Sequence, residues 1–130
     1  MKVVIALAIV VLSVTRAGAV GPCPTTIETK QVATASLEGW TVIALPLKHV
    51  LNTVVVFDGP PAEQVSLKYD EMLERGGTEV LVWGLTPGVQ YWIQCGYFGT
   101  SVALAKPLAL TVKRCEVSYS GNVVAAVTCE

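Results

Sequence analysis

The chain has no excess of charge of either sign. Nine Lys and Arg residues stand against ten Asp and Glu residues among 130, which gives a formal net charge of −1. Proteins that bind nucleic acids or anionic membrane surfaces concentrate basic residues on one face or along one segment. The balanced charge therefore removes nucleic acid from the expected partners.

Residues that build metal sites and nucleophilic active sites are also scarce. His49 is the one histidine, and the four cysteines include no C-x-x-C pair, so a zinc site lacks its usual ligands. No G-x-S-x-G nucleophile motif and no G-x-x-x-x-G-K phosphate loop occurs. We expect no metal and no cofactor, and we interpret His49 as a partly exposed residue at the entry to a strand.

No apolar stretch reaches the ~20 residues that span a bilayer as a helix. The longest, Val3–Val14, follows Lys2 and precedes Thr15–Ala19, which ends in the A-x-A pattern that signal peptidase cleaves. These features predict a signal peptide over residues 1–19 and an exported product, located in the periplasm or secreted, without a membrane span in the mature chain. An uncleaved anchor requires a longer apolar stretch.

Residues 20–130 form the predicted mature chain, whose length fits one domain. Cleavage removes two basic residues and no acid, so seven basic and ten acidic residues remain and the net charge becomes −3. All four cysteines remain as well, and an even number in a chain bound for an oxidising compartment predicts two disulfides. The sequence therefore predicts a single disulfide-bonded domain.

Four cysteines allow three pairings. Cys115 and Cys129 flank the turn signal Ser120–Asn122 and would face each other across a hairpin, which leaves Cys23 to pair with Cys95. The favoured pairing is therefore Cys115–Cys129 with Cys23–Cys95. A Cys95–Cys115 bridge with a Cys23–Cys129 bridge also fits a compact sheet, so both pairings stay open.

Period-two alternation and β-branched or aromatic residues dominate from Trp40 to the end of the chain, so the predicted fold class is all-β. A sheet of this size must bury one face, and Gly- and Pro-rich turns favour antiparallel neighbours. We expect a compact antiparallel sandwich or small barrel of about seven or eight strands. The expected strands are Trp40–Leu45, Val50–Phe57, Thr78–Leu85, Val89–Tyr97, Ser101–Ala105, Ala109–Tyr119 and Val123–Cys129, with a further candidate near Glu63–Leu67.

Three segments carry further information. Thr78–Leu85 has apolar residues on both faces, so we expect a central strand that is buried on both sides. Tyr69–Arg75 carries Glu71 and Arg75 at the i,i+4 spacing, and we expect it to be the one short helix, a surface connector. Residues 20–37 are rich in Thr and Ala and are predicted to form an edge strand or an extended arm tied down by Cys23.

Acidic residues offer an enzymatic alternative. Paired carboxylates hydrolyse glycosidic bonds, and Asp58, Glu63 and Asp70 belong to the available pool. Asp58 precedes Gly59–Pro61 and is better explained as a turn former, so no pair is marked out. A carboxylate-dependent hydrolase of envelope glycans therefore stands as the alternative to a non-enzymatic function.

Aromatic residues give the candidate binding site. In the expected strand over 89–97, alternation places Tyr91, Cys95 and Tyr97 on one face and Trp92 on the other, with Cys95 facing inward. An aromatic side chain on the outer face would anchor a protein partner or stack on a sugar ring. The binding candidates are Trp92, Tyr91 and Tyr97, and the plainer alternative is that all three tryptophans lie in the core.

Two motifs carry a resemblance to a family. F-D-G-P-P-x-E begins at Phe57 and C-x-Y-x-G-T begins at Cys95, and with the closing Cys129 the similarity extends over nearly the whole mature chain. The sequence resembles a family of small exported, cysteine-paired proteobacterial proteins of uncharacterised function. Tyr69 stands where that family more often has proline, which affects only the local turn. The resemblance implies export, paired cysteines and one small domain, and it implies no catalytic or binding residue.

These observations predict an exported, non-enzymatic binding module of the bacterial envelope. Its expected partner is an unknown protein or glycan, and a stoichiometric protein inhibitor is one form that such a module takes. Besides the hydrolase, a purely structural envelope protein is the remaining alternative.

Overall fold

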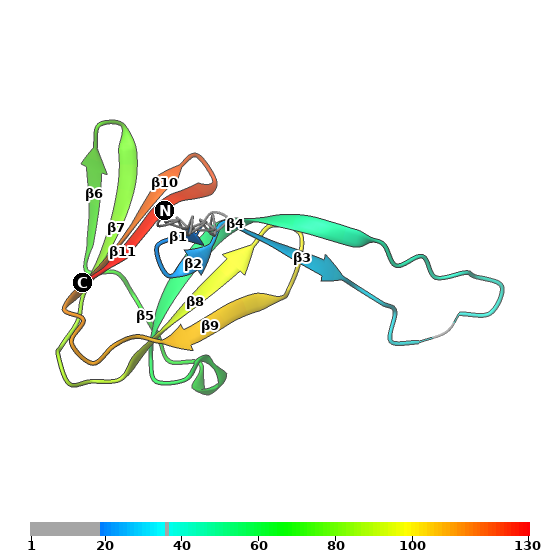
Figure 1. Cartoon of the computed structure of the whole chain (residues 1–130), viewed down its shortest axis with the longest axis horizontal. Coiled ribbons are helices and arrows are strands. Elements are labelled where there is room, and N and C mark those ends of the chain that lie inside the picture. Colours follow the sequence, from blue (N-terminus) through cyan, green and yellow to red (C-terminus); the bar gives the residue numbers. More distant parts are fainter. Residues whose placement is uncertain (1–18, 36) are drawn as a thin grey trace, which may run out of the picture.

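The structure is a computed structural model that describes residues 19–35 and 37–130 (Figure 1). Its fold class is all-β, as predicted, and the predicted signal peptide lies outside the described residues except for Ala19. The single helical element in the described residues is a 3-10 turn over Pro61–Glu63. The strands are β1 Ala19–Val20, β2 Cys23–Pro24, β3 Thr26–Lys30, β4 Pro46–Asp58, β5 Ser66–Leu67, β6 Glu71–Arg75, β7 Thr78–Gly84, β8 Tyr91–Tyr97, β9 Ala103–Pro107, β10 Arg114–Ser120 and β11 Val123–Cys129.

These strands form two curled antiparallel sheets that pack together as a half-barrel sandwich (Figure 1). One sheet has the strand order β11-β10-β7-β6, and the other has the order β3-β4-β8-β9 with β5 added beside β4. Strands β4 and β11 contact each other where the two sheets meet. The short β1–β2 hairpin is a separate two-stranded pair that belongs to neither sheet.

The core lies between the inner faces of the two sheets. β7 is an interior strand of its sheet, and Val80, Val82 and Trp83 are all buried, which confirms the predicted central strand. Trp83 donates its indole N–H to the Leu67 carbonyl oxygen at 3.1 Å, so its polar atom is satisfied inside the core. The fully buried side chains at the centre are Cys23, Leu51, Val56, Val82, Ile93, Cys115 and Val117.

The predicted helix over Tyr69–Arg75 is wrong, because residues 71–75 form strand β6. Gly76 and Gly77 both have positive φ angles, 64° and 80°, which is the backbone of a type I′ turn. That two-residue turn places Arg75 opposite Thr78 and pairs β6 with β7 along its whole length. A seven-residue helix gains too little from its own hydrogen bonds to compete with this pairing.

The predicted strand over Trp40–Leu45 is also wrong. These residues have no strand partner and form an irregular, exposed connection between β3 and β4. Two other strands are displaced from their predicted bounds: β9 begins at Ala103 rather than Ser101, and β10 begins at Arg114 because a turn occupies the residues before it. The predicted edge strand in the N-terminal segment is present as β3.

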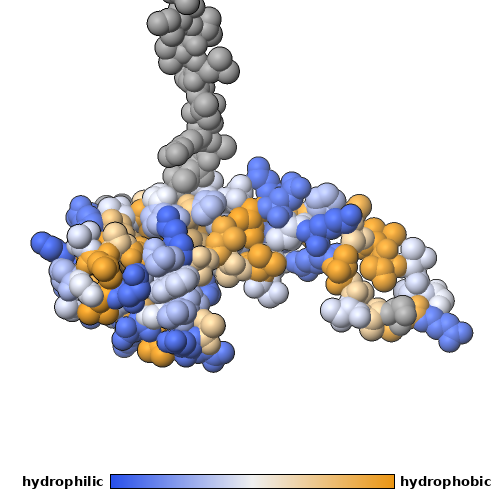
Figure 2. Space-filling view, turned by 60° about the horizontal axis from the view of Figure 1, so that its bottom comes forward, coloured by the Kyte–Doolittle hydropathy of each residue, from blue (hydrophilic) through white to orange (hydrophobic). Residues whose placement is uncertain are grey.

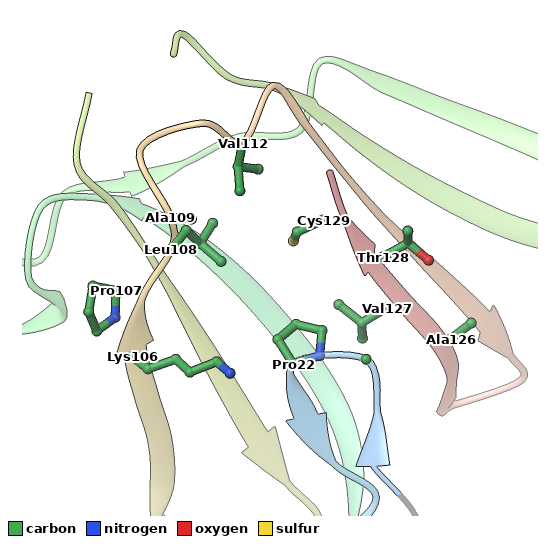
Figure 3. Close-up of a pocket in the computed structure, with 11 residues that line it drawn as sticks. Pro22, Lys106, Pro107, Leu108, Ala109, Val112, Ala126, Val127, Thr128 and Cys129 are labelled. Carbon is green, nitrogen blue, oxygen red and sulfur yellow. The ribbon is translucent and has the colours of Figure 1, made fainter. Parts of the chain in front are cut away.

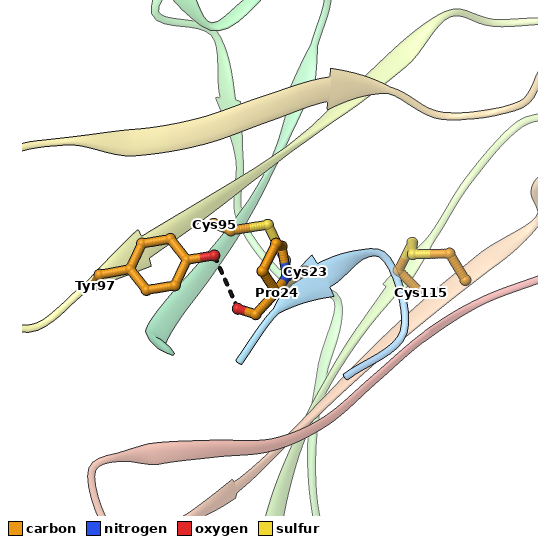
Figure 4. The surroundings of a disulfide bond; sticks show 6 residues. Cys23, Pro24, Cys95, Tyr97 and Cys115 are labelled. Carbon is orange, nitrogen blue, oxygen red and sulfur yellow. Dashed lines mark hydrogen bonds between the residues drawn. A yellow bond between two sulfur atoms is a disulfide. The ribbon is translucent and has the colours of Figure 1, made fainter. Parts of the chain in front are cut away.

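Two disulfides join Cys23 to Cys95 and Cys115 to Cys129. The second bond links residues that face each other across the β10–β11 ladder. The first bond fastens β2 to the buried face of β8 (Figure 4). The chain therefore enters β3 from a point that is covalently fixed to the core.

The turn between β1 and β2 sits directly on β11. Gly21 has a φ of 60°, and a Cβ built there would lie 1.8 Å from the Val127 carbonyl oxygen. Only glycine allows both this backbone conformation and this close approach. The N-terminal hairpin is thus held from two sides, by the Gly21 contact and by the Cys23 disulfide.

Candidate functional site

The three predicted binding aromatics lie in different environments. Tyr97 is only 4% exposed, and its hydroxyl donates a 2.9 Å hydrogen bond to the Pro24 carbonyl oxygen (Figure 4). Burial raises the pKa of Tyr97, so the hydroxyl keeps the proton that it donates. Tyr97 is therefore a core residue and not an exposed anchor, because β8 turns this face toward the other sheet.

Tyr91 and Trp92 are half-buried. Tyr91 packs against the core cluster, while Trp92 lies on the opposite face of β8 and stands between Phe57 and Pro107 in the strand register. The alternative that all three tryptophans lie in the core is wrong. Trp83 is buried, Trp92 is half-buried, and Trp40 is 78% exposed.

Many of the exposed apolar residues lie elsewhere, on a protrusion that we call the arm. The arm consists of β3, the described residues of the connection that follows it, 31–35 and 37–45, which we call the arm tip, and the first five residues of β4, 46–50. It extends from the body at the right of Figure 1, and apolar residues gather along it in Figure 2. Half of the sixteen exposed large hydrophobic residues in the described chain belong to it: Val32, Leu37, Trp40, Val42, Ile43, Leu45, Leu47 and Val50.

The base of the arm is held by His49, which was predicted to be partly exposed but is 5% exposed. The carbonyl oxygen of Phe98 lies 2.6 Å from Nδ1 and can only accept, so Nδ1 carries a proton and donates it. In the neutral ring, Nε2 then accepts a hydrogen bond from the Thr29 hydroxyl at 2.7 Å. His49 thereby joins β3, β4 and the turn after β8, and the prediction failed because β4 extends past the expected strand start.

Further hydrogen bonds fix the arm to the body. The Phe98 backbone N–H donates to the Val50 carbonyl oxygen at 3.0 Å, and the Gln31 side-chain amide donates to the Thr100 hydroxyl at 3.2 Å. The strand register between β4 and β8 also shifts at Asn52, where one extra residue of β4 is inserted. A bulge of this kind bends a strand, so β4 leaves the body at Asn52 and continues into the arm.

Apart from the arm, a groove lies at the open side of the half-barrel, where the sheets do not meet. This groove has a volume of about 720 Å³ and lies between the end of β9, the segment after it and β11, with the β1–β2 turn at one side (Figure 3). Its lining is largely apolar, from residues such as Pro22, Leu108 and Val112, and Lys106 extends into it. A lysine on the inner face of an edge strand opposes pairing with another strand.

The three acidic residues considered for the hydrolase alternative, Asp58, Glu63 and Asp70, each occupy a different structural position. Asp70 accepts a 2.6 Å hydrogen bond from the Gly84 backbone N–H and so fastens the approach to β6 onto the end of β7. Asp58 ends β4, and Glu63 ends the 3-10 turn. In residues 19–35 and 37–130, no three His, Cys, Asp or Glu side chains are grouped so that they could hold a metal ion.

The strongest electrostatic cluster is structural. Glu116 accepts hydrogen bonds from Arg114 at 2.7 and 2.9 Å and from Arg75 at 3.2 Å. Hydrogen bonding from Arg114, the larger cause, and from Arg75 lowers the pKa of Glu116 below its usual value. The three residues lie on β6 and β10, on either side of β7, and tie that sheet together across its outer surface.

Comparison with known proteins places the chain in a family. A model of the type VI secretion system Tli immunity protein family matches residues 46–130. The chain belongs to this family. It is also 28% identical over 104 residues to an Azospirillum brasilense protein described as an uncharacterized 16.3 kDa protein in the trpG 5′ region. The aligned region covers 74% of this chain and 69% of that protein. No solved structure matches the chain.

Membership in the Tli immunity family confirms the predicted function class. Effector immunity proteins are stoichiometric protein inhibitors, which is the binding module of inhibitor type that the sequence favoured. The match begins at Pro46, so it includes β4 to β11 and leaves out the arm tip. None of the helices in the part of the chain that the structure describes is long and apolar enough to cross a membrane.

Sequence reasoning did not identify the arm as a candidate site. The signal was present in Trp40–Leu45, in which only Thr41 is polar and no residue is charged, but such a segment has the same composition as a buried strand. Only the absence of a partner strand for these residues distinguishes the two, and pairing is a property of the whole fold.

Proposed function

We propose that this chain is exported to the periplasm and neutralises one cognate type VI secretion effector by forming a one-to-one complex with it, without catalysing a reaction. The family match over residues 46–130 carries the proposal, because it includes both sheets of the body. Inhibition by binding requires a rigid surface that is ordered before the partner arrives, and requires no nucleophile or cofactor.

Two observations support the location and the mode of action. Disulfides form and persist in oxidising compartments such as the periplasm, and this chain has two, one within a sheet and one at the start of the arm. The predicted signal peptide over residues 1–19 would bring the chain there. The exposed apolar arm supports binding, because contiguous apolar surface on a folded protein is typical of protein interaction sites.

Growth protection tests this proposal. Each type VI effector of the bacterium that encodes the chain is directed to the periplasm of a tester strain, with or without residues 1–130 of this protein. We expect the chain to restore growth against one effector and to co-purify with it at a molar ratio of one. Protection against none of the effectors would refute the proposal.

A version without residues 1–19 serves as the matched control. It keeps the whole described fold except Ala19 but lacks the predicted export signal, so it should not protect against an effector that acts in the periplasm. Equal protection by this version would contradict the periplasmic location. Inactivation of the effector by far less than an equimolar amount of chain would instead favour an enzymatic function.

A further inference from the structure

We infer that the arm tip is the element that enters an apolar concavity of the cognate effector. This inference rests on the proposed function, because the effector is the partner to which it commits the arm. Three observations support it: the exposure of the tip, its low charge, and the way its base is held.

The tip is apolar, exposed and almost uncharged. Trp40, Ile43 and Leu45 are 78%, 72% and 65% exposed, and Glu38 is the one charged residue in the connection. Large aromatic and aliphatic side chains that fill a partner's pocket dominate the energy of protein interfaces, and Trp leads among them. A tip of this composition fits a concave, apolar and uncharged site on the partner.

The base of the arm is prepared for binding before a partner arrives. Five register pairs join β3 to β4, and Glu28 stands directly opposite Lys48 in this ladder. His49 and the Cys23–Cys95 disulfide fix the same base to β8 and the turn after it. An element that is already held in position loses less conformational entropy on binding, so more of the contact energy appears as affinity.

A second copy and a membrane are the other possible occupants. The arm carries Glu28, Lys30, Glu38 and Lys48, which balance one another, so nothing concentrates positive charge for anionic headgroups. The effector is favoured over a second copy because the family is defined by immunity to effectors. Both alternatives are outcomes of the experiment below.

The test uses a triple variant, Trp40→Ser, Ile43→Ser and Leu45→Ser, of the complete mature chain. All three side chains are exposed, so their removal leaves the core intact. The matched control removes three exposed apolar side chains of the body: Met72→Ser, Leu110→Ser and Val123→Ser. The probe is the purified effector against which the wild-type chain protects, and the measured quantity is Kd.

We expect the Kd of the arm variant to rise by about 100-fold or more, because central aromatic and aliphatic anchors carry losses of this size. The Kd of the control variant should stay within about threefold of the wild-type value. In a second measurement, hydrogen exchange of the wild-type chain should slow in residues 31–50 when the effector binds. This second measurement needs no variant, so it keeps the inference testable if the triple variant does not fold.

The outcomes separate the inference from the proposed function. The inference is overturned, and the function stands, if the wild-type chain binds the effector while the arm variant has an equal Kd and hydrogen exchange in the arm does not slow. A wild-type chain that binds no effector overturns the function itself. An arm buried in a stable homodimer, or an arm that binds vesicles of phosphatidylethanolamine and phosphatidylglycerol and not the effector, also overturns the inference.

Discussion

Removing the Cys23–Cys95 disulfide should destabilise the protein more than removing the Cys115–Cys129 disulfide. The first bond closes a loop with a sequence separation of 72, and the second closes one with a separation of 14. The loop-closure entropy of the unfolded chain then gives about 4.5 kcal/mol for the long bridge and about 3 kcal/mol for the short one. The difference is only about 1.5 kcal/mol, because this entropy grows with the logarithm of loop length.

Burial adds to the difference in the same direction. Cys23 and Cys95 both belong to the core, whereas Cys129 is half-buried, so alanine at the first pair removes more packed volume. The assay is urea unfolding of the two double-alanine variants beside the oxidised wild type, followed by the fluorescence of buried Trp83. A larger loss of unfolding free energy at the Cys115–Cys129 pair, or a loss below about 1 kcal/mol at the Cys23–Cys95 pair, would refute the loop-closure reasoning.

Three further predictions concern single residues. Gly21→Ala should lower the unfolding free energy by roughly 2 kcal/mol or more in thermal unfolding, because its Cβ would meet a β11 carbonyl oxygen. The control Gly121→Ala, at a position with a similar φ of 61° but open space around it, should lower it less, and equal losses would contradict the packing argument. His49→Leu leaves the Phe98 carbonyl oxygen without the side-chain donor of His49, so it should lower the unfolding free energy by about 1–3 kcal/mol in urea titrations. An unchanged unfolding free energy would show that the histidine does not hold the arm. The lowered pKa of Glu116 adds stability that is present above the usual glutamate pKa and is lost as pH falls through the lowered value. Glu116→Gln should therefore flatten the fall of the unfolding free energy in this acidic pH range, and an unaltered fall would contradict the role given to Glu116.

Much of the body could be predicted from the sequence. The strands that alternate strongly and end in clear turn residues, such as Val50–Phe57 and Val123–Cys129, lie within β4 and coincide with β11. The central position of β7 followed from apolar residues on both of its faces. These features depend on local periodicity, which the sequence carries directly.

The errors occurred where pairing decides the structure. The sequence contains the turn pair Gly76–Gly77, but the strand that this turn allows at residues 71–75, in place of the predicted helix, depends on pairing with β7. Trp40–Leu45 has the composition of a strand but no partner beside it. Tyr97 was a predicted binding residue although alternation places it on the face of Cys95, which was expected to point inward, and it is buried there.

For the same reason the candidate site was predicted only in kind. An aromatic surface for a partner was expected on β8, and the exposed tryptophan is instead Trp40, at the end of the arm. The Asn52 bulge that directs β4 away from the body has no local sequence signature. A site on a protruding element is therefore visible only once the whole sheet is assembled.

A titration of the effector with this chain tests the central claim, stoichiometric inhibition, most directly. The cognate effector is held at a concentration far above Kd, the oxidised mature chain is added in steps, and the remaining toxic activity is measured after each step. The activity should fall in a straight line and reach zero at one molecule of chain per effector. Complete loss at a small fraction of that ratio, or undiminished activity beyond it, would contradict the account.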